Sequence, residues 1–254
     1  MNLAVFFTTI RNKILKSSPL DSEFKTFGTQ QIFNKIYRQK RWGQSAHGGT
    51  SGRGSHDPML VAPYVSVIKE VLSRFSTRPS MVDLGCGDFN VGRHFKGEVS
   101  SLTACDVSDI IIAQNIRLNV DENIQFLQLD LAKDPIPKAD IFCVRQVLQH
   151  VANSEISAFV SALHEQKPCR ALIVTEHLST DPLFIANKDK YTGVTTRASL
   201  MSGVDLAHPP FSLEYTQKEV LLELTEPCDG QPGLLRTTLY TFDNAFPTLT
   251  KKGE

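Results

Sequence analysis

The sequence has no long apolar run, no excess of charge of one sign and no paired cysteines. No run in the 254 residues approaches the roughly 20 apolar residues that a membrane-spanning helix needs. Lysine and arginine total 27 and balance 27 acidic residues, so the chain lacks the positive surface that extensive contact with nucleic acid demands. The five cysteines are odd in number and never form a C-x-x-C pair, which argues against disulfides and a structural zinc.

These absences favour a reducing, cytoplasmic location, with no nucleic-acid partner. The apolar Leu3–Phe7 has no positive charge before it and no small-residue cleavage site after it, which disfavours a signal peptide. The seven histidines show no metal-ligand spacing, so no metal is expected.

The N-terminal segment is basic and amphipathic. Lysines and arginines are frequent over residues 11–41, and Phe33, Ile36 and Tyr37 recur at helical spacing. This pattern predicts a helix that packs on the domain or rests on a membrane surface, and a solvated helix face is the simpler explanation of its charges. The aromatic stripe is typical of a packing face. We expect residues 1–56 to form an N-terminal helical cap that ends in a Gly/Ser-rich loop.

The main domain is expected over residues 57–246. Gly43 to Ser55 is too rich in glycine and serine to hold a regular element, so it predicts a loop. Asp57 then fits as an N-cap and Pro58 as the first residue of a helix. A loop that leads into a helix N-terminus suits a carboxylate or phosphate ligand. A mere linker is the alternative.

The rest of the chain alternates predicted strands and helices, which favours a parallel sheet with helices on both faces. The expected strands lie near 80–84, 101–106, 124–129, 139–144 and 170–176, and the expected helices near 90–96, 108–117, 145–151 and 154–166. Residues 220–224 and 234–242 predict an antiparallel hairpin. Residues 178–212 match no regular element and are typical of a lid or a binding loop.

The most informative stretch runs from the first strand into a glycine turn, over Met81–Asn90. Gly85 and Gly87 have no Cβ, so backbone there can approach a nucleotide-like ligand closely. Asp83 and Asp88 add negative charge beside the turn. A ligand with an ammonium group, a sulfonium and a ribose therefore fits better than a pyrophosphate, which needs N–H groups aimed at an anion.

The segment Asp83–Gly87 resembles the first motif of class I S-adenosylmethionine-dependent methyltransferases. Four later segments are similar to the following strands of that family in order and spacing: Leu102–Asp106, Phe126–Asp130, Asp140–Val144 and Ala171–Glu176. The resemblance implies an α/β fold, a Rossmann-like doubly wound seven-stranded sheet with a C-terminal antiparallel hairpin. It also implies S-adenosyl-L-methionine as the cofactor.

Ligands of open α/β sheets sit beyond the carboxyl ends of the strands, so the residues there are the candidates. The resemblance implies that Asp83 lies near the methionine ammonium, that Asp106 accepts hydrogen bonds from both ribose hydroxyls and that Asp130 flanks the adenine. A turn or cap role is the alternative for each acid. The expected cofactor residues are Asp83, Gly85, Cys86, Gly87, Asp88, Asp106, Val107, Asp130, Leu131 and Arg145.

Two histidines are candidate general bases for transfer to a hydroxyl. His150 follows the fourth strand and His177 follows the fifth, and histidine titrates near neutral pH. A histidine packed between a helix and the sheet is the alternative for His150.

A narrower resemblance is to a bacterial methyltransferase group that often accompanies glycan-biosynthesis genes. It implies a hydroxyl of a sugar or another small metabolite as the acceptor. This chain has Arg145-Gln146 where the group tends to carry Arg-Asp, so the acid expected at position 146 is missing. The similar pieces are Ile36-Tyr37, Trp42-Gly43, Ser51–Ser55, Cys86–Asn90, Thr192-Gly193 and Pro209–Phe211.

Four alternatives stay open. The same cofactor could serve a protein or RNA acceptor, or the chain could be a non-catalytic partner subunit that binds it. A nicotinamide-dependent reductase is a third reading, since Gly85, Gly87 and Asp106 fit its fingerprint, although Asn90 replaces the third glycine. In the fourth alternative, the stretch is a strand, a turn and a helix whose glycines merely allow tight packing. The oligomeric state is not indicated by the sequence.

Overall fold

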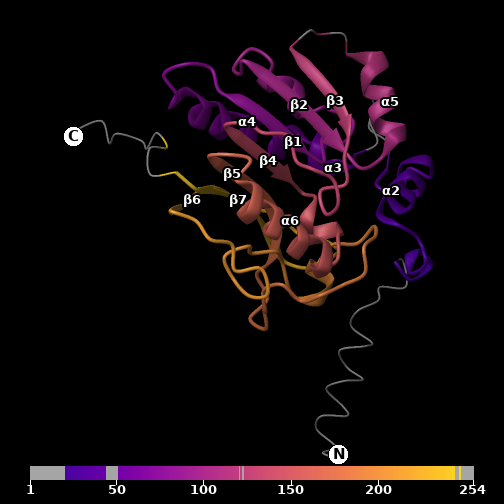
Figure 1. The fold of residues 1–254 in the computed structure, drawn as a ribbon. Coiled ribbons are helices and arrows are strands. Elements are labelled where there is room, and N and C mark those ends of the chain that lie inside the picture. The colour runs from indigo at the N-terminus through magenta and orange to yellow at the C-terminus, as the bar shows by residue number, and fades with distance from the viewer. Residues whose placement is uncertain (1–20, 44–50, 120, 122, 244–245, 247–254) are drawn as a thin grey trace, which may run out of the picture.

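The chain folds around one mixed sheet of seven strands, in the order β3-β2-β1-β4-β5-β7-β6 (Figure 1). The computed structural model describes residues 21–43, 51–119, 121, 123–243 and 246. The first five strands are parallel and the last two are antiparallel to their neighbours. The strands are β1 (Ser80–Leu84), β2 (Ser101–Asp106), β3 (Ile124–Gln128), β4 (Ile141–Arg145), β5 (Ala171–Ser179), β6 (Gln217–Thr225) and β7 (Gly233–Thr241).

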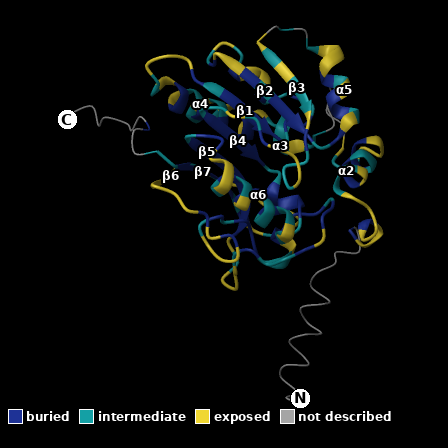
Figure 2. Cartoon of the chain, viewed as in Figure 1, coloured by how far each residue is buried: buried dark blue, intermediate teal, exposed yellow. Residues whose placement is uncertain are grey.

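The strand order reverses between β1 and β4, which is the switch point of a doubly wound sheet. The predicted Rossmann-like fold with a C-terminal antiparallel hairpin is confirmed. Every residue of β4 and β5 is buried, and the central strands form the buried interior in Figure 2. Because both faces of these strands are covered, their sequences are nearly continuous apolar runs.

Three long helices flank the sheet, and α6 lies in front of it in Figure 1. They are α4 (Pro58–Ser73), α5 (Asp109–Leu118) and α6 (Asn153–Gln166). Asp57 caps α4 as predicted, since its Oδ1 accepts a hydrogen bond of 2.9 Å from the N–H of Met59. The protein's own carboxylate therefore occupies this helix N-terminus, where the sequence suggested a ligand.

The helices predicted near 90–96 and 145–151 are wrong, because only short 3₁₀ turns form there. They are η2 (Gly92–Phe95) and η3 (Leu148–His150). Phe89 and Gln146 precede these turns with φ angles of 60° and 56°. A left-handed residue turns the chain sharply, so no longer helix follows directly from the strand.

The N-terminal part contributes η1 (Ser22–Phe24), α2 (Thr29–Arg38) and α3 (Arg53–His56). Figure 1 shows α2 beside α5, where the side chain of Asn34 joins the two helices. Its Nδ2 donates to Asp109 Oδ1 at 2.7 Å, and its Oδ1 accepts from Ser108 Oγ at 2.6 Å. The cap shares one hydrophobic core with the rest of the described chain. The expected basic residues before position 21 lie outside the described residues.

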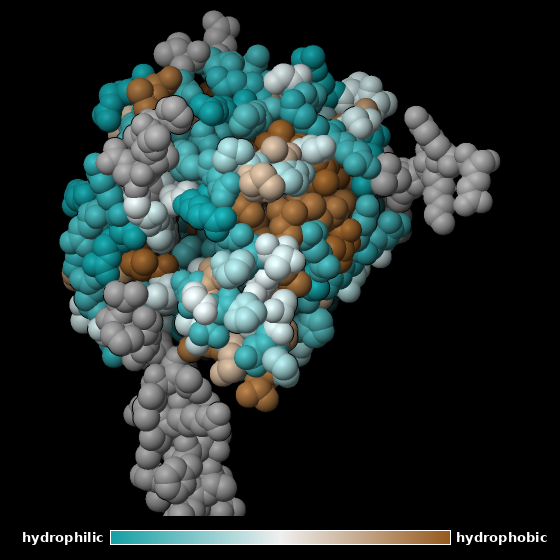
Figure 3. All heavy atoms as spheres, turned by 180° about the vertical axis from the view of Figure 1, so that it is seen from behind, coloured by the Kyte–Doolittle hydropathy of each residue, from teal (hydrophilic) through white to brown (hydrophobic). Residues whose placement is uncertain are grey.

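The connection between β5 and β6 is long and holds only one short turn, η4 (Ala198–Leu200), as predicted. No helix of the described residues is long and apolar enough to cross a membrane. Seen from behind, the surface is mainly hydrophilic, with one large patch of hydrophobic residues and smaller ones elsewhere (Figure 3).

Candidate functional site

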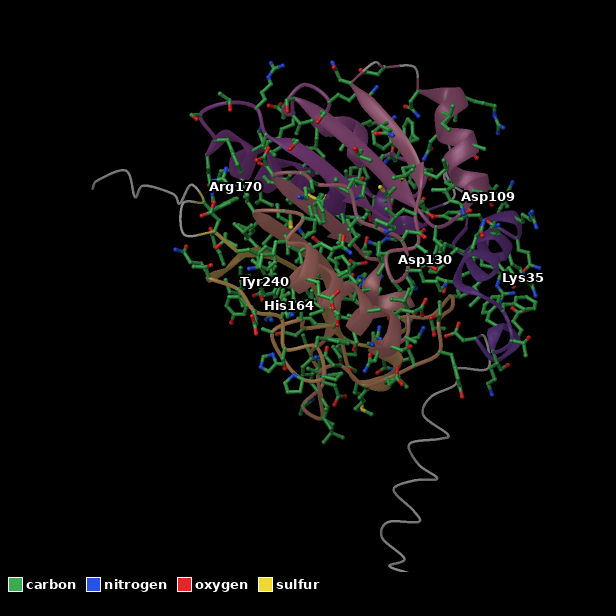
Figure 4. All side chains as sticks on the ribbon, viewed as in Figure 1. Lys35, Asp109, Asp130, His164, Arg170 and Tyr240 are labelled. Atoms are coloured by element: carbon green, nitrogen blue, oxygen red, sulfur yellow. The ribbon has the colours of Figure 1, made fainter. Side chains whose placement is uncertain are left out.

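A cavity of about 210 Å³ lies at the carboxyl ends of the strands, next to the point where the strand order reverses. The sheet contributes the glycine turn after β1 and the residues that follow β2, β3 and β4. Helix α2 and residues 51–55 contribute the opposite walls. In Figure 4, Asp130 lies on the same side of the molecule as Lys35 and Asp109, away from Arg170.

The glycine turn fits tightly between two loops. Gly85 and Gly87 have φ angles of 81° and 53°, which favour glycine. A Cβ on Gly85 would lie 2.2 Å from the side chain of Val147, and one on Gly87 would lie 2.3 Å from Ser51 Oγ. The two predicted glycines therefore both line the cavity, and each allows a close approach of another segment.

Asp106 ends β2 and its carboxylate faces the cavity. One oxygen accepts hydrogen bonds from the N–H of Gly87 at 3.1 Å and from the Tyr37 hydroxyl at 3.5 Å, and the other accepts from the N–H of Ser108 at 2.9 Å. Burial raises its pKa to about 6, although these hydrogen bonds oppose the rise. Two carboxylate oxygens offer about four acceptor positions, so capacity for further donors is left. Val107 also lines the cavity.

Asp130 and Leu131 line the cavity beside it. The Asp130 carboxylate also holds its own turn, since it accepts from the N–H of Ala132 at 3.0 Å and from Lys133 Nζ at 2.5 Å. The ligand role and the turn role proposed from the sequence are thus compatible at this residue.

Three of the predicted cofactor residues do not line the cavity. Asp83 points its carboxylate toward Gly92, and burial raises its pKa to about 7. It has no hydrogen-bond partner among the described residues. The Sγ of Cys86 lies 3.8 Å from Asn115 Nδ2, in the core behind the turn.

Asp88, the third of these residues, binds the cap instead. Its Oδ2 accepts from the N–H of Ser51 at 3.1 Å and lies 2.7 Å from His56 Nε2. The N–H of Asp88 donates to Ser51 Oγ at 2.8 Å. Close by, Asn90 Nδ2 donates to the carbonyl of Ser55 at 2.6 Å. The acidic and amide residues after the glycines therefore fasten the segment 51–56 over the glycine turn.

The loop 147–151, which follows β4, is held from one side by Glu176. This buried carboxylate accepts hydrogen bonds from three consecutive N–H groups, at 3.1, 2.9 and 2.9 Å. They belong to Val147, Leu148 and Gln149. Burial raises the Glu176 pKa to about 7, and the three hydrogen bonds oppose that rise.

Arg197 holds the same loop from the other side and is fully buried. Its guanidinium donates to the carbonyls of Leu148 and Val151, both at 2.7 Å. It also donates to Asn153 Oδ1 at 2.8 Å and to the carbonyl of Lys188 at 3.0 Å. The N–H groups and the carbonyls of loop 147–151 are thus bound by a buried carboxylate and a buried guanidinium, and we call these two residues the loop clamp.

His150 is carried by this loop and lines the cavity. Its ring lies 4.9 Å from the ring of Trp42, and its Nε2 lies 3.3 Å from Gln149 Nε2. Its Nδ1 is buried and makes no hydrogen bond of ordinary geometry to the described part of the chain. Burial lowers the pKa of His150 to about 3, and the charge of Lys190 acts in the same direction. The imidazole is therefore neutral at pH 7.

His177, the other predicted base, does not line the cavity. Its Nδ1 lies 2.9 Å from Gln149 Oε1, and burial lowers its pKa to about 4. The structure thus places His150 at the cavity and His177 behind it.

The cap contributes three aromatic rings to the cavity wall: Phe33, Tyr37 and Trp42. The ring of Trp42 lies 6.0 Å from that of Phe33 and 5.6 Å from that of Tyr37. Phe33 and Tyr37 also belong to the core, so the packing face predicted from their spacing is at the same time a wall of the site. Gln149, Glu155 and Arg53 line the cavity as well and were missed, because no local pattern connects them with the glycine motif.

No group of histidine, cysteine, aspartate or glutamate side chains in the described residues could hold a metal ion.

The model of a known family, described as an O-methyltransferase domain, matches residues 18–192 of this chain. Human acetylserotonin O-methyltransferase is 28% identical over 117 residues, which are 43% of this chain and 34% of that protein. The chain thus spans about a third of the length of that relative.

Two solved structures share the fold. The N-methyltransferase NodS from Bradyrhizobium japonicum WM9, in complex with S-adenosylhomocysteine, superposes with a TM-score of 0.55 at 13% identity, over 84% of this chain and 98% of that chain. Human N-acetylserotonin methyltransferase, in complex with S-adenosylmethionine, gives a TM-score of 0.52 at 16% identity, over 93% of this chain and 66% of that chain. At such identities the structures establish the fold alone.

Proposed function

Because this chain belongs to the O-methyltransferase domain family, we propose that it transfers a methyl group from S-adenosyl-L-methionine to a hydroxyl of a sugar or another small metabolite. Membership rests on a family match that covers more than half of the chain. The resemblance to methyltransferases that the glycine motif suggested is thereby confirmed, and the chain is a methyltransferase. The cofactor, the acceptor and the roles of single residues are the proposal.

The residues at the cofactor end suit an adenosyl ligand. Asp106 is buried, faces the cavity and keeps free acceptor capacity, which matches the two hydroxyls of a ribose. Gly85 and Gly87 leave backbone open to the cavity, and Leu131 offers an apolar contact for a base. When bound, the cofactor supplies an electrophilic methyl group on a sulfonium sulfur.

The position of His150 is the single observation that supports a hydroxyl group as the methyl acceptor. His150 is a neutral imidazole that lines the cavity, and its buried Nδ1 makes no hydrogen bond of ordinary geometry to the described residues, although the Thr195 backbone acts on the ring as a hydrogen-bonding group. Such a nitrogen accepts a hydrogen bond from an incoming hydroxyl and takes its proton as the oxygen–carbon bond forms. A pKa near 3 makes His150 a weak base, so the proton moves only as methyl transfer makes the hydroxyl acidic.

The loop clamp fixes the position of this base. Glu176 and Arg197 bind the backbone on both sides of His150, which limits the search for a reactive geometry. The loop clamp therefore contributes mainly orientation.

The first test is thermal stability in the presence of S-adenosylmethionine, S-adenosylhomocysteine, NAD and NADP. We expect stabilisation by the first two alone, since a ligand that binds only the folded state raises the melting temperature. Stabilisation by a nicotinamide cofactor alone would remove the proposal. Binding of S-adenosylmethionine without turnover on any hydroxyl compound would favour a partner subunit or a macromolecular acceptor.

Once an acceptor is found, His150→Ala tests the base. We expect turnover to fall by about 10²- to 10⁴-fold, with S-adenosylmethionine affinity within threefold of the unchanged protein. His177→Ala is the matched control and should lose far less turnover, because His177 lies behind the cavity. Full activity of His150→Ala at neutral pH would exclude the role.

A further inference from the structure

Asp21 is a buried carboxylate of the N-terminal cap that binds a segment far along the chain. Its exposed fraction is 1%. Its Oδ1 accepts hydrogen bonds from the N–H groups of Val194 at 2.7 Å and Thr195 at 3.3 Å, and its Oδ2 accepts one from the Thr195 hydroxyl. The same Oδ2 lies 3.5 Å from Lys190 Nζ. Four donors thus surround this carboxylate, which is about the number that two ionised oxygens can accept.

Lys190 is the second buried charge of this cluster. Its exposed fraction is 4%, and its ammonium also donates to the carbonyls of Tyr191 at 2.6 Å and His150 at 3.4 Å. Burial lowers the pKa of Lys190 to about 8, and the charge of Asp21 opposes that change. A charge withdrawn from water needs an opposite charge and hydrogen bonds, so Asp21 stabilises the charged Lys190 beside the carbonyl of His150.

Segment 190–195 holds His150 at two points. The N–H of Gly193 donates to the carbonyl of His150 at 2.9 Å, the same carbonyl that Lys190 contacts. The backbone of Thr195 acts as a hydrogen-bonding group on the imidazole ring and opposes the lowering of its pKa. The loop clamp binds the residues on either side of His150, whereas these contacts bind His150 itself.

Trp42 attaches the cap to the same segment from the wall of the cavity. Its Nε1 donates to the carbonyl of Val194 at 3.2 Å, and its ring lies 4.9 Å from the ring of His150. Asp21 and Trp42 therefore bind Val194 by its N–H and by its carbonyl. The cap, segment 190–195 and His150 thus form one hydrogen-bonded unit, although they lie far apart in the sequence.

We propose that Asp21 is a positioning residue for methyl transfer, which fixes the imidazole of His150 through Thr195 and the carbonyl of His150 through Lys190. This inference rests on the proposed function, since it takes His150 to be the base. Asp21 does not line the cavity, so it acts on the reaction only through these residues. Because a small displacement of a reacting group costs a large share of the rate, loss of this carboxylate should lower turnover more than binding.

Asp21→Asn tests the inference, because it keeps the size of the side chain and removes its charge. We expect kcat to fall about 10- to 100-fold and the affinity for S-adenosylmethionine to stay within about threefold, since a misplaced base affects the transition state alone. In His150→Ala the same substitution should lower kcat less than about twofold, because its effect passes through a group that is already absent. A merely structural role of Asp21 would lower kcat by the same factor with and without His150.

Trp42 provides a readout that needs no acceptor. It is the only tryptophan of the chain, so its fluorescence reports on the contact between the cap, segment 190–195 and His150. Asp21→Asn removes the bond that holds the N–H of Val194, whose carbonyl accepts from Trp42. We therefore expect acrylamide to quench Trp42 more strongly in this variant than in the unchanged protein.

Asp205→Asn is the matched control. Asp205 belongs to the same connection between β5 and β6, and its carboxylate also binds a lysine, Lys218 at 3.4 Å, and a backbone N–H, that of Ala207 at 3.0 Å. It does not line the cavity, so kcat and the quenching of Trp42 should stay as in the unchanged protein.

Lys190→Met keeps the inference testable if Asp21→Asn does not fold. It leaves the bonds of Asp21 to Val194 and Thr195 in place and removes the ammonium from the carbonyl of His150. Turnover should still fall several-fold, and again only where His150 is present.

Two results would overturn the inference: an unchanged kcat of Asp21→Asn, or an equal loss of kcat with and without His150. The proposed function fails differently, by the absence of turnover on any hydroxyl compound or by full activity of His150→Ala. In both of those cases the quenching of Trp42 still decides whether Asp21 holds segment 190–195 against His150, and unchanged quenching would show that it does not.

Discussion

The two ends of the cavity are built in different ways. At the cofactor end, Asp106 and the glycine turn come from neighbouring strand ends, and the carboxylate keeps acceptor positions free. At the end near His150, which we assign to the acceptor, most polar groups other than His150 Nδ1 are already bound to one another. Glu155, for example, accepts from Thr29 Oγ1 at 2.5 Å and also from the Thr192 hydroxyl. The cofactor end thus has unused hydrogen-bond acceptors. The acceptor end is held by contacts between segments that lie far apart in the sequence.

This comparison predicts that the acceptor end responds to substitution mainly through stability. Arg197→Met should destabilise the protein by about 3–5 kcal/mol, because it leaves buried carbonyls of loop 147–151 without donors. Chemical denaturation measures this effect. Arg236→Met, which removes an exposed ion pair with Glu223, is the control and should cost no more than about 0.5 kcal/mol. Equal losses in the two variants would contradict the role of the loop clamp.

The cofactor end should respond mainly through affinity. Asp106→Ala should weaken binding of S-adenosylmethionine by about 1–3 kcal/mol, because the ribose hydroxyls lose their acceptor. The unfolding midpoint of the unliganded protein should change less than in Arg197→Met. Isothermal titration calorimetry and thermal unfolding of the same samples separate the two effects. Unchanged affinity would remove the ribose role of Asp106.

The same carboxylate predicts a pH dependence of binding. Hydrogen bonds from ribose hydroxyls favour the ionised form of Asp106, and its pKa is about 6. Affinity should therefore be nearly full at pH 7, be about halved at pH 6 and be about tenfold lower at pH 5, as the carboxylate takes up a proton. Asp106→Ala should lose this pH-dependent component of binding. An identical pH profile for both proteins would show that Asp106 does not titrate with binding.

The smallest effect on cofactor affinity is expected for the contact between the N-terminal cap and Asp106. Tyr37→Phe removes the hydroxyl that lies 3.5 Å from Asp106 Oδ2. At that distance the hydrogen bond is weak, so affinity for S-adenosylmethionine should change by about threefold or less. A loss as large as that of Asp106→Ala would mean that the cap, rather than the strand end, controls the ribose site.

The sheet and the cofactor end could be predicted because they depend on local signals. The apolar runs located all seven strands to within a few residues at each end, and the glycine motif indicated the turn that lines the cavity. The acceptor end could not be predicted in this way. Arg197 lies about 50 residues from the loop that it holds, and nothing in its neighbourhood marks it as buried.

Asp88 has a role in the structure that the sequence did not indicate. Its place directly after Gly87 suggested a ligand contact, but its carboxylate binds Ser51 and His56 of the cap. The motif indicated that a functional site was near, whereas the partner of this side chain lies more than 30 residues earlier in the sequence. Such pairings depend on the tertiary arrangement and leave no periodic pattern.

The contact of Ser51 with Gly87 also has a consequence for which step limits the rate of turnover. Segment 51–56 covers the glycine turn and is fastened there by Asp88 and Asn90. We expect a cofactor that binds beneath this segment to leave only after these bonds break. Turnover is then expected to be limited by departure of the spent cofactor rather than by chemistry, with a rapid first cycle and slower later ones.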